Sequence, residues 1–183
     1  MQEIRSKFEP LADCAIDWGV IGHLQTNKLK NVARLASEVQ SLDRMELAAA
    51  LHRRLQMEGR VLNALVQVKT SRKETKYGLP PDELPAFLDS LRDFPSLHVR
   101  GLMTLAIHST DPFEVRACFR RLRELRDQAI VHGHDLPRLS MGMSGDFPLA
   151  IAEGGTELRI GPAIFGNRPY PDSYYWPESP DWS

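Results

Sequence analysis

The sequence predicts an α/β protein whose parallel strands are joined by helices. Apolar runs of strand length alternate with segments of helical periodicity from residue 2 to about residue 168. The run at 61–68 is apolar almost throughout, which is typical of a parallel strand buried on both faces. This order of one helix, five strand–helix units and a last strand predicts a parallel sheet with helical crossovers.

Apolar spacing and end residues place the individual elements. Leu47, Leu51 and Leu55 recur at the spacing of one helix face, and Asp43 with Glu46 resembles a capping box at the start of that helix. Strands are expected at 18–22, 38–42, 61–68, 97–105, 138–142 and 157–161. Helices are expected at 2–12, 28–36, 82–92 and 146–153, together with two longer ones that follow residues 43 and 111.

The longest predicted helix begins at Asp111. This residue can cap the helix, Pro112 suits its first turn, and Glu114 follows three positions after the cap. The apolar residues that fall on one side of this helix are Val115, Cys118, Phe119, Leu122, Leu125 and Ala129. Cys118 is therefore expected to be a small buried residue.

Composition argues against several classes of partner. The 183 residues include 23 basic and 24 acidic side chains, for a formal net charge of −1, so neither nucleic acid nor an anionic membrane is expected to bind. No apolar run approaches the ~20 residues of a membrane helix, and the first residues do not follow a signal-peptide pattern. Two cysteines do not make a disulfide framework, so we expect a cytoplasmic protein, with a monomer as the expected state.

Two loops near the end of the chain carry the residues best suited to binding. The alternation fits either an open doubly wound sheet or a (β/α)₈ barrel, and in both architectures ligands bind beyond the carboxyl ends of the strands. The loops 142–146 and 161–166 follow the last two predicted strands. Ser144 offers an N–H group and a hydroxyl, and Gly161 lets its backbone approach an anion closely. These loops predict either a phosphate cradle or ordinary tight turns.

Several blocks of the sequence are similar to one known family. They include IGHLQTNK at 21–28, SMGMSGD at 140–146 and LRIGPAIFG at 158–166, with shorter blocks at 76–79, 100–104 and 150–154. In this order and spacing they resemble the pyridoxal phosphate homeostasis protein family from residue 2 to about residue 168. The resemblance implies a single (β/α)₈ barrel like the N-terminal domain of alanine racemase. It also implies a protein that binds pyridoxal 5′-phosphate (PLP), has no established catalytic activity, and buffers or delivers this cofactor to recipient apo-enzymes.

The resemblance implies a role for particular residues. The PLP phosphate would lie on Ser144 and Gly161, and Arg159 would lie beneath the pyridine ring. The further cofactor-binding residues that it implies are Met143, His23 and Met103. An arginine beneath the ring cannot be the anion that keeps the ring nitrogen protonated, so the cofactor would be a weak electron sink. This suits a carrier better than an enzyme, and neither a catalytic residue nor a metal ligand is expected.

The beginning of the chain departs from the family pattern. Family members start with two further strand–helix units, and the first of these carries the lysine that holds PLP covalently. This chain begins within the helix after the second unit, so six of the eight barrel strands are expected and PLP binding would be non-covalent or weak. A wrongly assigned start is the favoured explanation, with a fragment and a degenerate copy as alternatives.

A second departure lies in the loop that would hold the phosphate. Pro162 stands where the family usually has threonine or serine. Proline supplies neither a hydroxyl nor a backbone N–H group, so the phosphate would lose up to two hydrogen bonds. A hydrogen bond to a charged group is worth about 1.5–3 kcal/mol. Weak PLP binding is therefore expected even in a complete barrel.

Other interpretations of the same residues remain open at this point. The segment 142–146 nearly matches the G-x-S-x-G elbow of serine hydrolases, but Asp146 replaces its last glycine. His132 and His134 follow a predicted helix end, where a solvated loop is more typical than a metal site. A racemase-like enzyme and a remnant that binds nothing are the rival functions. Residues 169–183, rich in proline and aromatic side chains, are expected to form a tail outside the domain at 1–168.

Overall fold

The computed structural model describes residues 2–71 and 77–166 and shows a single six-stranded parallel sheet with helices around it. The strands are β1 (Gly19–Val20), β2 (Glu38–Leu42), β3 (Leu62–Gln67), β4 (Leu97–Met103), β5 (Arg138–Met143) and β6 (Glu157–Arg159). The α-helices are α1 (Gln2–Phe8), α2 (Leu29–Leu35), α3 (Met45–Met57), α4 (Leu84–Ser90), α5 (Pro112–Val131), α6 (Phe147–Ala152) and α7 (Pro162–Phe165). Short 3₁₀ turns precede α2 at Thr26–Lys28 and flank α4 at Pro81–Glu83 and Leu91–Asp93. The expected tail at 169–183 lies outside the described residues.

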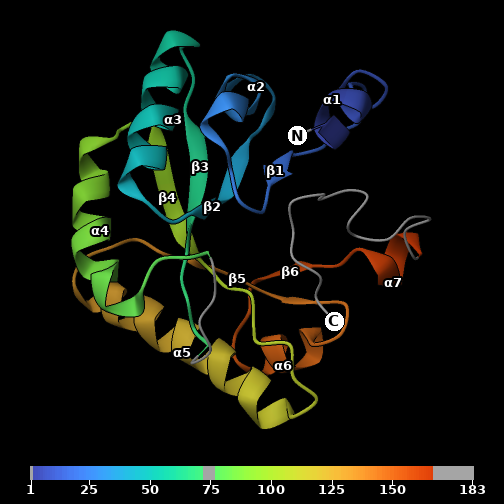
Figure 1. Cartoon of the computed structure of the whole chain (residues 1–183), viewed down its shortest axis with the longest axis vertical. Helices are drawn as coiled ribbons and strands as arrows, with labels where there is room; N and C mark the ends of the chain where they lie inside the picture. Colours follow the sequence, from blue (N-terminus) through green and yellow to red (C-terminus); the bar gives the residue numbers. More distant parts are fainter. Residues whose placement is uncertain (1, 72–76, 167–183) are drawn as a thin grey trace.

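The order of the strands decides between the two closures that the sequence allowed. Every strand pairs in parallel with the next one along the chain, from β1 to β6. A doubly wound sheet reverses its strand order at a switch point, whereas a barrel adds each strand on the same side of the previous one. Figure 1 shows α3, α4 and α5 following one another around the outside of a curled sheet. The fold is therefore a half-barrel of the (β/α)₈ type, as the resemblance implied.

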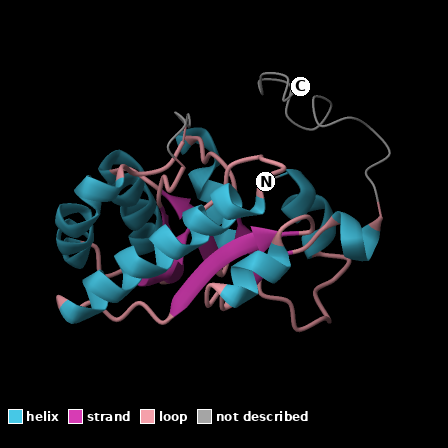
Figure 2. Cartoon of the chain, turned by 90° about the horizontal axis from the view of Figure 1, so that it is seen from below, coloured by secondary structure: helices cyan, strands magenta, loops and turns pink. Residues whose placement is uncertain are grey.

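The hydrophobic core lies between the sheet and the helices outside it. Leu47, Leu51 and Leu55 of α3 are fully buried, as their spacing predicted. Phe119 and Leu122 of α5 are fully buried too, and Cys118 beside them is buried as expected. In the turned view of Figure 2 the helices again lie around the strands. These apolar residues hold the helices against the outer face of the sheet. The inner face of the sheet carries other side chains, many of them polar.

The ends of the two long helices gave one correct prediction and one wrong one. The Asp111 carboxylate accepts a hydrogen bond from the Phe113 N–H at 2.8 Å, so the predicted cap of α5 is confirmed. The capping box at Asp43 is wrong, because α3 begins at Met45 and Arg44 is the cap residue, without a side-chain hydrogen bond. Asp43 instead binds Arg44 Nη1 at 2.7 Å and the Gly78 N–H at 3.2 Å. These contacts hold it at the carboxyl end of β2.

Most other boundaries agree with the prediction within two residues. The main exception is α1, which ends at Phe8 rather than at residue 12, because Pro10 disfavours helical geometry in the residue before it. The short helix α7 was not predicted, although Pro162 occupies the first-turn position that proline favours. In the part of the chain that the structure describes, no helix is long and apolar enough to cross a membrane.

Gly142 allows the strand β5 to lie close to the helix that follows it. Its φ angle is +91°, and a Cβ atom there would lie 2.6 Å from the Cβ atom of Ala150 in α6. Only glycine fits such a conformation at such a distance. The pairing of β5 with β6 shifts register between Ser140 and Met143, beside this glycine. The close approach fixes where the 143–146 loop leaves the sheet.

Candidate functional site

The loops after β5 and β6 leave the same edge of the sheet side by side. Met143 pairs with Arg159 across the two parallel strands. Ser144 comes one residue after Met143, and Gly161 comes two residues after Arg159. Because both loops begin at the carboxyl ends of neighbouring parallel strands, these four residues belong to one end of the half-barrel.

Ser144 has a buried hydroxyl for which the described residues offer no partner. Its Oγ atom is inaccessible to solvent and makes no hydrogen bond within that part of the protein. The loop that carries it is held by Asp146, whose carboxylate accepts from the Met143 N–H at 2.6 Å and whose N–H donates to the Met143 carbonyl at 3.1 Å. Buried polar groups normally have partners, so a lone hydroxyl in a fixed loop indicates a place for a ligand group.

Gly161 leaves free space on its side of the same region. Apart from Gly161 itself and its two neighbours in the chain, no heavy atom of the described residues lies within 4 Å of the position that a Cβ atom would occupy. The residue is half-buried and precedes α7, whose first position is Pro162. The backbone at Gly161 can therefore be approached by a bulky anion, and the residues present fit a phosphate group.

Arg159 is held by neutral oxygen atoms at the end of β6. Its Nη1 donates to Ser140 Oγ at 2.7 Å, and its Nη2 donates to the Thr104 carbonyl at 2.7 Å. Its Nε atom is buried and has no partner among the described residues. Burial lowers the pKa of the guanidinium, and the carboxylates of Glu157 and Asp146 oppose this effect. Arginine nevertheless stays charged in proteins, so a cation whose Nε–H group has no partner among the described residues lies at this end of the barrel.

Threonine side chains extend the polar surface beside Arg159. Thr104 Oγ1 donates to the Val68 carbonyl at 2.8 Å and lies 2.9 Å from Thr70 Oγ1. Both threonines are buried and follow β4 and β3. Through the Thr104 carbonyl, this pair connects the guanidinium of Arg159 to two more strand ends.

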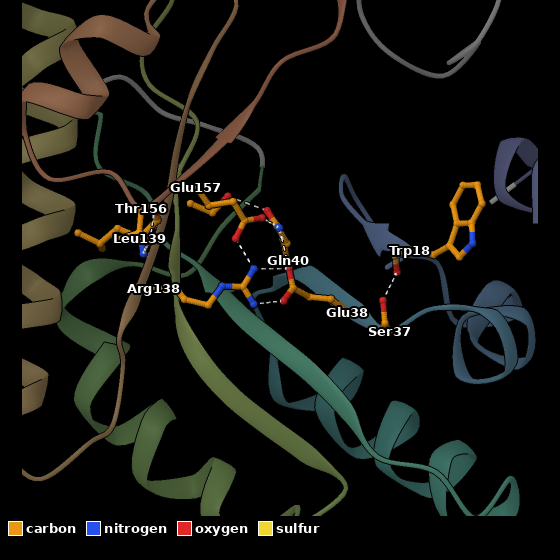
Figure 3. A network of polar contacts seen from close by, with 9 residues as sticks. Trp18, Ser37, Glu38, Gln40, Arg138, Leu139, Thr156 and Glu157 are labelled. Atoms are coloured by element: carbon orange, nitrogen blue, oxygen red, sulfur yellow. Dashed lines mark hydrogen bonds and ion pairs between the residues drawn. The ribbon is translucent and has the colours of Figure 1, made fainter. Parts of the chain in front are cut away.

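A larger polar network, which the sequence analysis missed, fills the inner face of the sheet. Arg138 binds both carboxylate oxygens of Glu38 and also binds Glu157. Gln40 donates to Glu38 Oε1 at 2.7 Å and to Glu157, and its own amide oxygen accepts from Ser140 Oγ at 2.7 Å. Figure 3 shows Arg138 reaching from β5 toward Glu38 of β2 and Glu157 of β6, with Gln40 beside the two carboxylates.

The signal for this network was present in the sequence. Glu38 and Gln40, Arg138 and Ser140, and Glu157 and Arg159 are polar pairs two residues apart within strands. Side chains two residues apart in a strand lie on the same face, so each pair marks one polar face of an otherwise buried strand. The inward faces of barrel strands stack in layers, which brings the three pairs together.

The remaining predicted residues lie at different depths and in different places. Met103 ends β4 beside Ser140 and is 1% exposed, whereas Met143 ends β5 and is 43% exposed. His23 follows β1 and stacks on Tyr77, with 4.5 Å between the ring centroids. The structure thus gathers Ser144, Gly161, Arg159 and the two methionines around β4 to β6, and holds His23 with the loop after β3.

The described residues do not form the arrangement that a serine hydrolase or a metal site needs. A serine nucleophile needs a base within hydrogen-bond reach, and Ser144 Oγ has no hydrogen-bond partner there. Within residues 2–71 and 77–166, no group of three histidine, cysteine or acidic side chains is placed to hold a metal ion. The described residues therefore place a hydroxyl, a glycine and a half-buried arginine at the carboxyl ends of β5 and β6.

This fold and this site define a class, the barrel domain of the alanine racemase type. The family described as "Alanine racemase, N-terminal domain" matches residues 12–169. An alanine racemase from Clostridium difficile 630 superposes with a TM-score of 0.73 over 92% of this chain and 44% of its own, at 12% identity, which reflects the shared fold alone. More similar proteins narrow the assignment.

The chain belongs to the pyridoxal phosphate homeostasis protein family. It is 41% identical to the pyridoxal phosphate homeostasis protein of Aquifex aeolicus over 171 residues, 93% of this chain and 75% of that protein. It is 38% identical to the protein of the same name from Pseudomonas aeruginosa, over 93% of this chain and 73% of that one. The structure of PipY from Synechococcus elongatus with PLP bound has a TM-score of 0.83 and 33% identity, covering 90% of this chain and 78% of PipY.

Proposed function

We propose that this chain binds PLP non-covalently and serves as a carrier that buffers the cofactor and releases it to apo-enzymes. The observation that carries this proposal is the buried hydroxyl of Ser144, directly after β5, which has no partner among the described residues. A phosphate oxygen is the acceptor that such a hydroxyl lacks, and hydrogen bonds to charged groups are the strong ones. The likeness to PipY, which binds PLP, supports the choice of this phosphate ester over other anions.

Each residue of the site has a proposed part in holding the cofactor. Ser144 and the backbone around Gly161 hold the phosphate, and the Nε–H group of Arg159 donates to the ring nitrogen. Met103, Met143 and His23 border the ring. PLP supplies an electron sink when it is bound, and a ring nitrogen that accepts from arginine stays unprotonated, which weakens that sink. The arrangement therefore suits storage and transfer of the cofactor rather than amino-acid chemistry.

Non-covalent binding is proposed because of where the lysines lie. Lys7 is in α1, Lys28 and Lys30 lie in the 3₁₀ turn and helix after β1, and Lys69 follows β3. Lys73 and Lys76 fall outside the described residues. A lysine that holds PLP in a barrel of this type has to reach its interior, and the six described strands contain none.

Titration of the purified chain with PLP, followed by absorbance and by tryptophan fluorescence, tests the proposal. The wild-type chain should bind one equivalent saturably, and inorganic phosphate should compete. Ser144→Ala should weaken binding by about 10- to 150-fold, because it removes a hydrogen bond to a charged group. Ser90→Ala is the matched control, because the hydroxyl of Ser90 lies on α4 and donates to the Ala86 carbonyl. This variant should bind PLP as tightly as the wild type does.

Two results would contradict the proposal. If the wild-type chain shows no saturable binding, or if Ser144→Ala binds as tightly as the wild type, the site is not where PLP is held. Borohydride reduction and mass spectrometry add a separate check. A phosphopyridoxyl group found on a lysine of this chain would show that binding is covalent and would exclude the non-covalent form of the proposal.

A further inference from the structure

The donor and the acceptor of each hydrogen bond around Gln40 can be assigned from the chemistry of the groups involved. Ionised carboxylates can only accept hydrogen bonds. Gln40 contacts two of them, Glu38 at 2.7 Å and Glu157, so its amide NH₂ group must face these acceptors. The amide oxygen of Gln40 is thereby turned toward Ser140, 2.7 Å from its Oγ atom.

The same reasoning fixes the Ser140 hydroxyl. A serine hydroxyl has one proton, and Ser140 gives it to Gln40 Oε1. Its oxygen is then left as an acceptor, and Arg159 Nη1 donates to it at 2.7 Å. Ser140 is fully buried, so no solvent competes for either bond. The two carboxylates therefore orient the amide group of Gln40, Gln40 orients the hydroxyl of Ser140, and Ser140 accepts from the guanidinium of Arg159. We call this chain of hydrogen bonds the relay.

The carboxylates of Glu38 and Glu157 form ion pairs with Arg138, and in the described structure they make no direct hydrogen bond with Arg159. Arg138 binds Glu38 and Glu157, and these hydrogen bonds and charges raise its pKa against the lowering effect of burial. Both described hydrogen bonds of Arg159 end on neutral oxygens, those of Ser140 and Thr104. The position of Arg159 consequently depends on two neutral groups rather than on a direct ion pair.

We propose that Gln40 and Ser140 are positioning residues that aim the Nε–H group of Arg159 at the cofactor ring. Neither side chain touches the ring, and both act through Arg159. This inference rests on the proposed function, since it gives a purpose to the Nε atom, for which residues 2–71 and 77–166 offer no partner. Gln40→Met and Ser140→Ala each remove one link of the relay and leave every carboxylate and arginine in place.

Two measurements on the full chain test the relay, one without PLP and one with it. In the PLP-free protein, the Arg159 Nε–H resonance is assigned by its loss in Arg159→Lys, and its chemical shift and hydrogen exchange are then followed. Both relay variants should shift this resonance and speed its exchange at least severalfold. In PLP titrations both should bind about 10-fold more weakly than the wild type, because the hydrogen bond from Arg159 to the ring is misaligned.

Ser41→Ala is the matched control for both measurements. Ser41 follows Gln40 on β2, is also buried, and has an Oγ atom without a partner among the described residues. Its variant should leave the resonance and the PLP affinity unchanged. Thermal unfolding of all variants separates a loss of structure from a loss of orientation, and a variant whose resonance moves only as much as that of Ser41→Ala would overturn the relay.

The two measurements separate failure of the relay from failure of the proposed function. If the wild type binds no PLP, the proposed function fails, while the resonance still decides whether Gln40 and Ser140 orient Arg159. If the wild type binds PLP and both relay variants leave the resonance unchanged, the relay is wrong and the cofactor site stands.

Discussion

At the scale of single residues, the two loops of the proposed phosphate site differ in the hydrogen-bond donors that they offer. Pro162 follows Gly161 directly and begins α7. Its ring replaces an N–H donor, and it carries no hydroxyl, whereas Ser144 on the neighbouring loop keeps both groups. The two loops thus contribute unequally to the proposed phosphate site.

Replacing this proline should strengthen PLP binding. Pro162→Ser restores a hydroxyl and an N–H group, and each new hydrogen bond to the phosphate should tighten binding by about 10- to 150-fold. The measurement is the PLP titration described above. Pro81→Ser, at the 3₁₀ turn before α4, is the control for the loss of a proline in a first turn. An affinity for Pro162→Ser no higher than that of the wild type would mean that the phosphate does not reach this loop.

At the scale of elements, one buried carboxylate joins α5 to the end of α6. Glu153 is 2% exposed and contacts Arg116 at 2.5 Å, Arg120 at 3.4 Å and Arg123 at 2.8 Å. Burial would raise the pKa of Glu153, but the hydrogen bonds from Arg116 and Arg120 and the charge of Arg123 outweigh it and lower the pKa. Since α6 follows the Ser144 loop, this contact also supports the site.

The lowered pKa predicts a particular dependence of stability on pH. A carboxyl group whose pKa is lower in the folded state stabilises the fold above its unfolded pKa, about 4.3 for glutamate, and loses this contribution as the pH falls through the folded value. Glu153→Gln should therefore lower the free energy of unfolding by about 2 kcal/mol at pH 7. The difference from the wild type should shrink below about pH 4.

Urea unfolding between pH 7 and pH 3 measures this difference. Glu124→Gln, on the same helix α5, is the control and should change stability little at any pH. A Glu153→Gln variant whose deficit stays constant down to pH 3 would show that the carboxylate charge is not what joins the two helices.

At the scale of the whole molecule, the polar network ties distant strands across the inside of the half-barrel. Arg138 of β5 and Glu38 of β2 are 100 residues apart in sequence, and two strands lie between theirs in the sheet. The backbone hydrogen bonds of the sheet connect only neighbouring strands. The ion pairs of Arg138 with Glu38 and Glu157 therefore favour the curled form of the sheet over a flat one.

Arg138→Met should destabilise the protein. It leaves the carboxylates of Glu38 and Glu157 without their counter-charge, and the loss of a hydrogen bond to a charged group costs about 1.5–3 kcal/mol. Urea unfolding at pH 7 measures this loss. Equal stability of Arg138→Met and wild type at pH 7 would rule out this role.

The fold was largely predictable because its signals are local. The periodicity of Leu47, Leu51 and Leu55 and the cap at Asp111 depend on residues within one or two turns, and the structure confirms them. Asp43 failed as a capping residue because its carboxylate binds the side chain of the adjacent Arg44 and the N–H group of Gly78, which lies 35 residues further along the chain. The contact with Gly78 cannot be predicted from the residues near Asp43 alone.

The sequence by itself determined the alternation of strands and helices, the buried helix faces and the family to which the chain belongs. Only the tertiary structure decided that the strands follow one another in a single direction around a half-barrel. It also decided that Glu38, Gln40, Arg138 and Glu157 meet inside the sheet below Arg159. The physical reason is distance along the chain, because strand order and inner-face contacts join residues up to 117 positions apart, as Gln40 and Glu157 are.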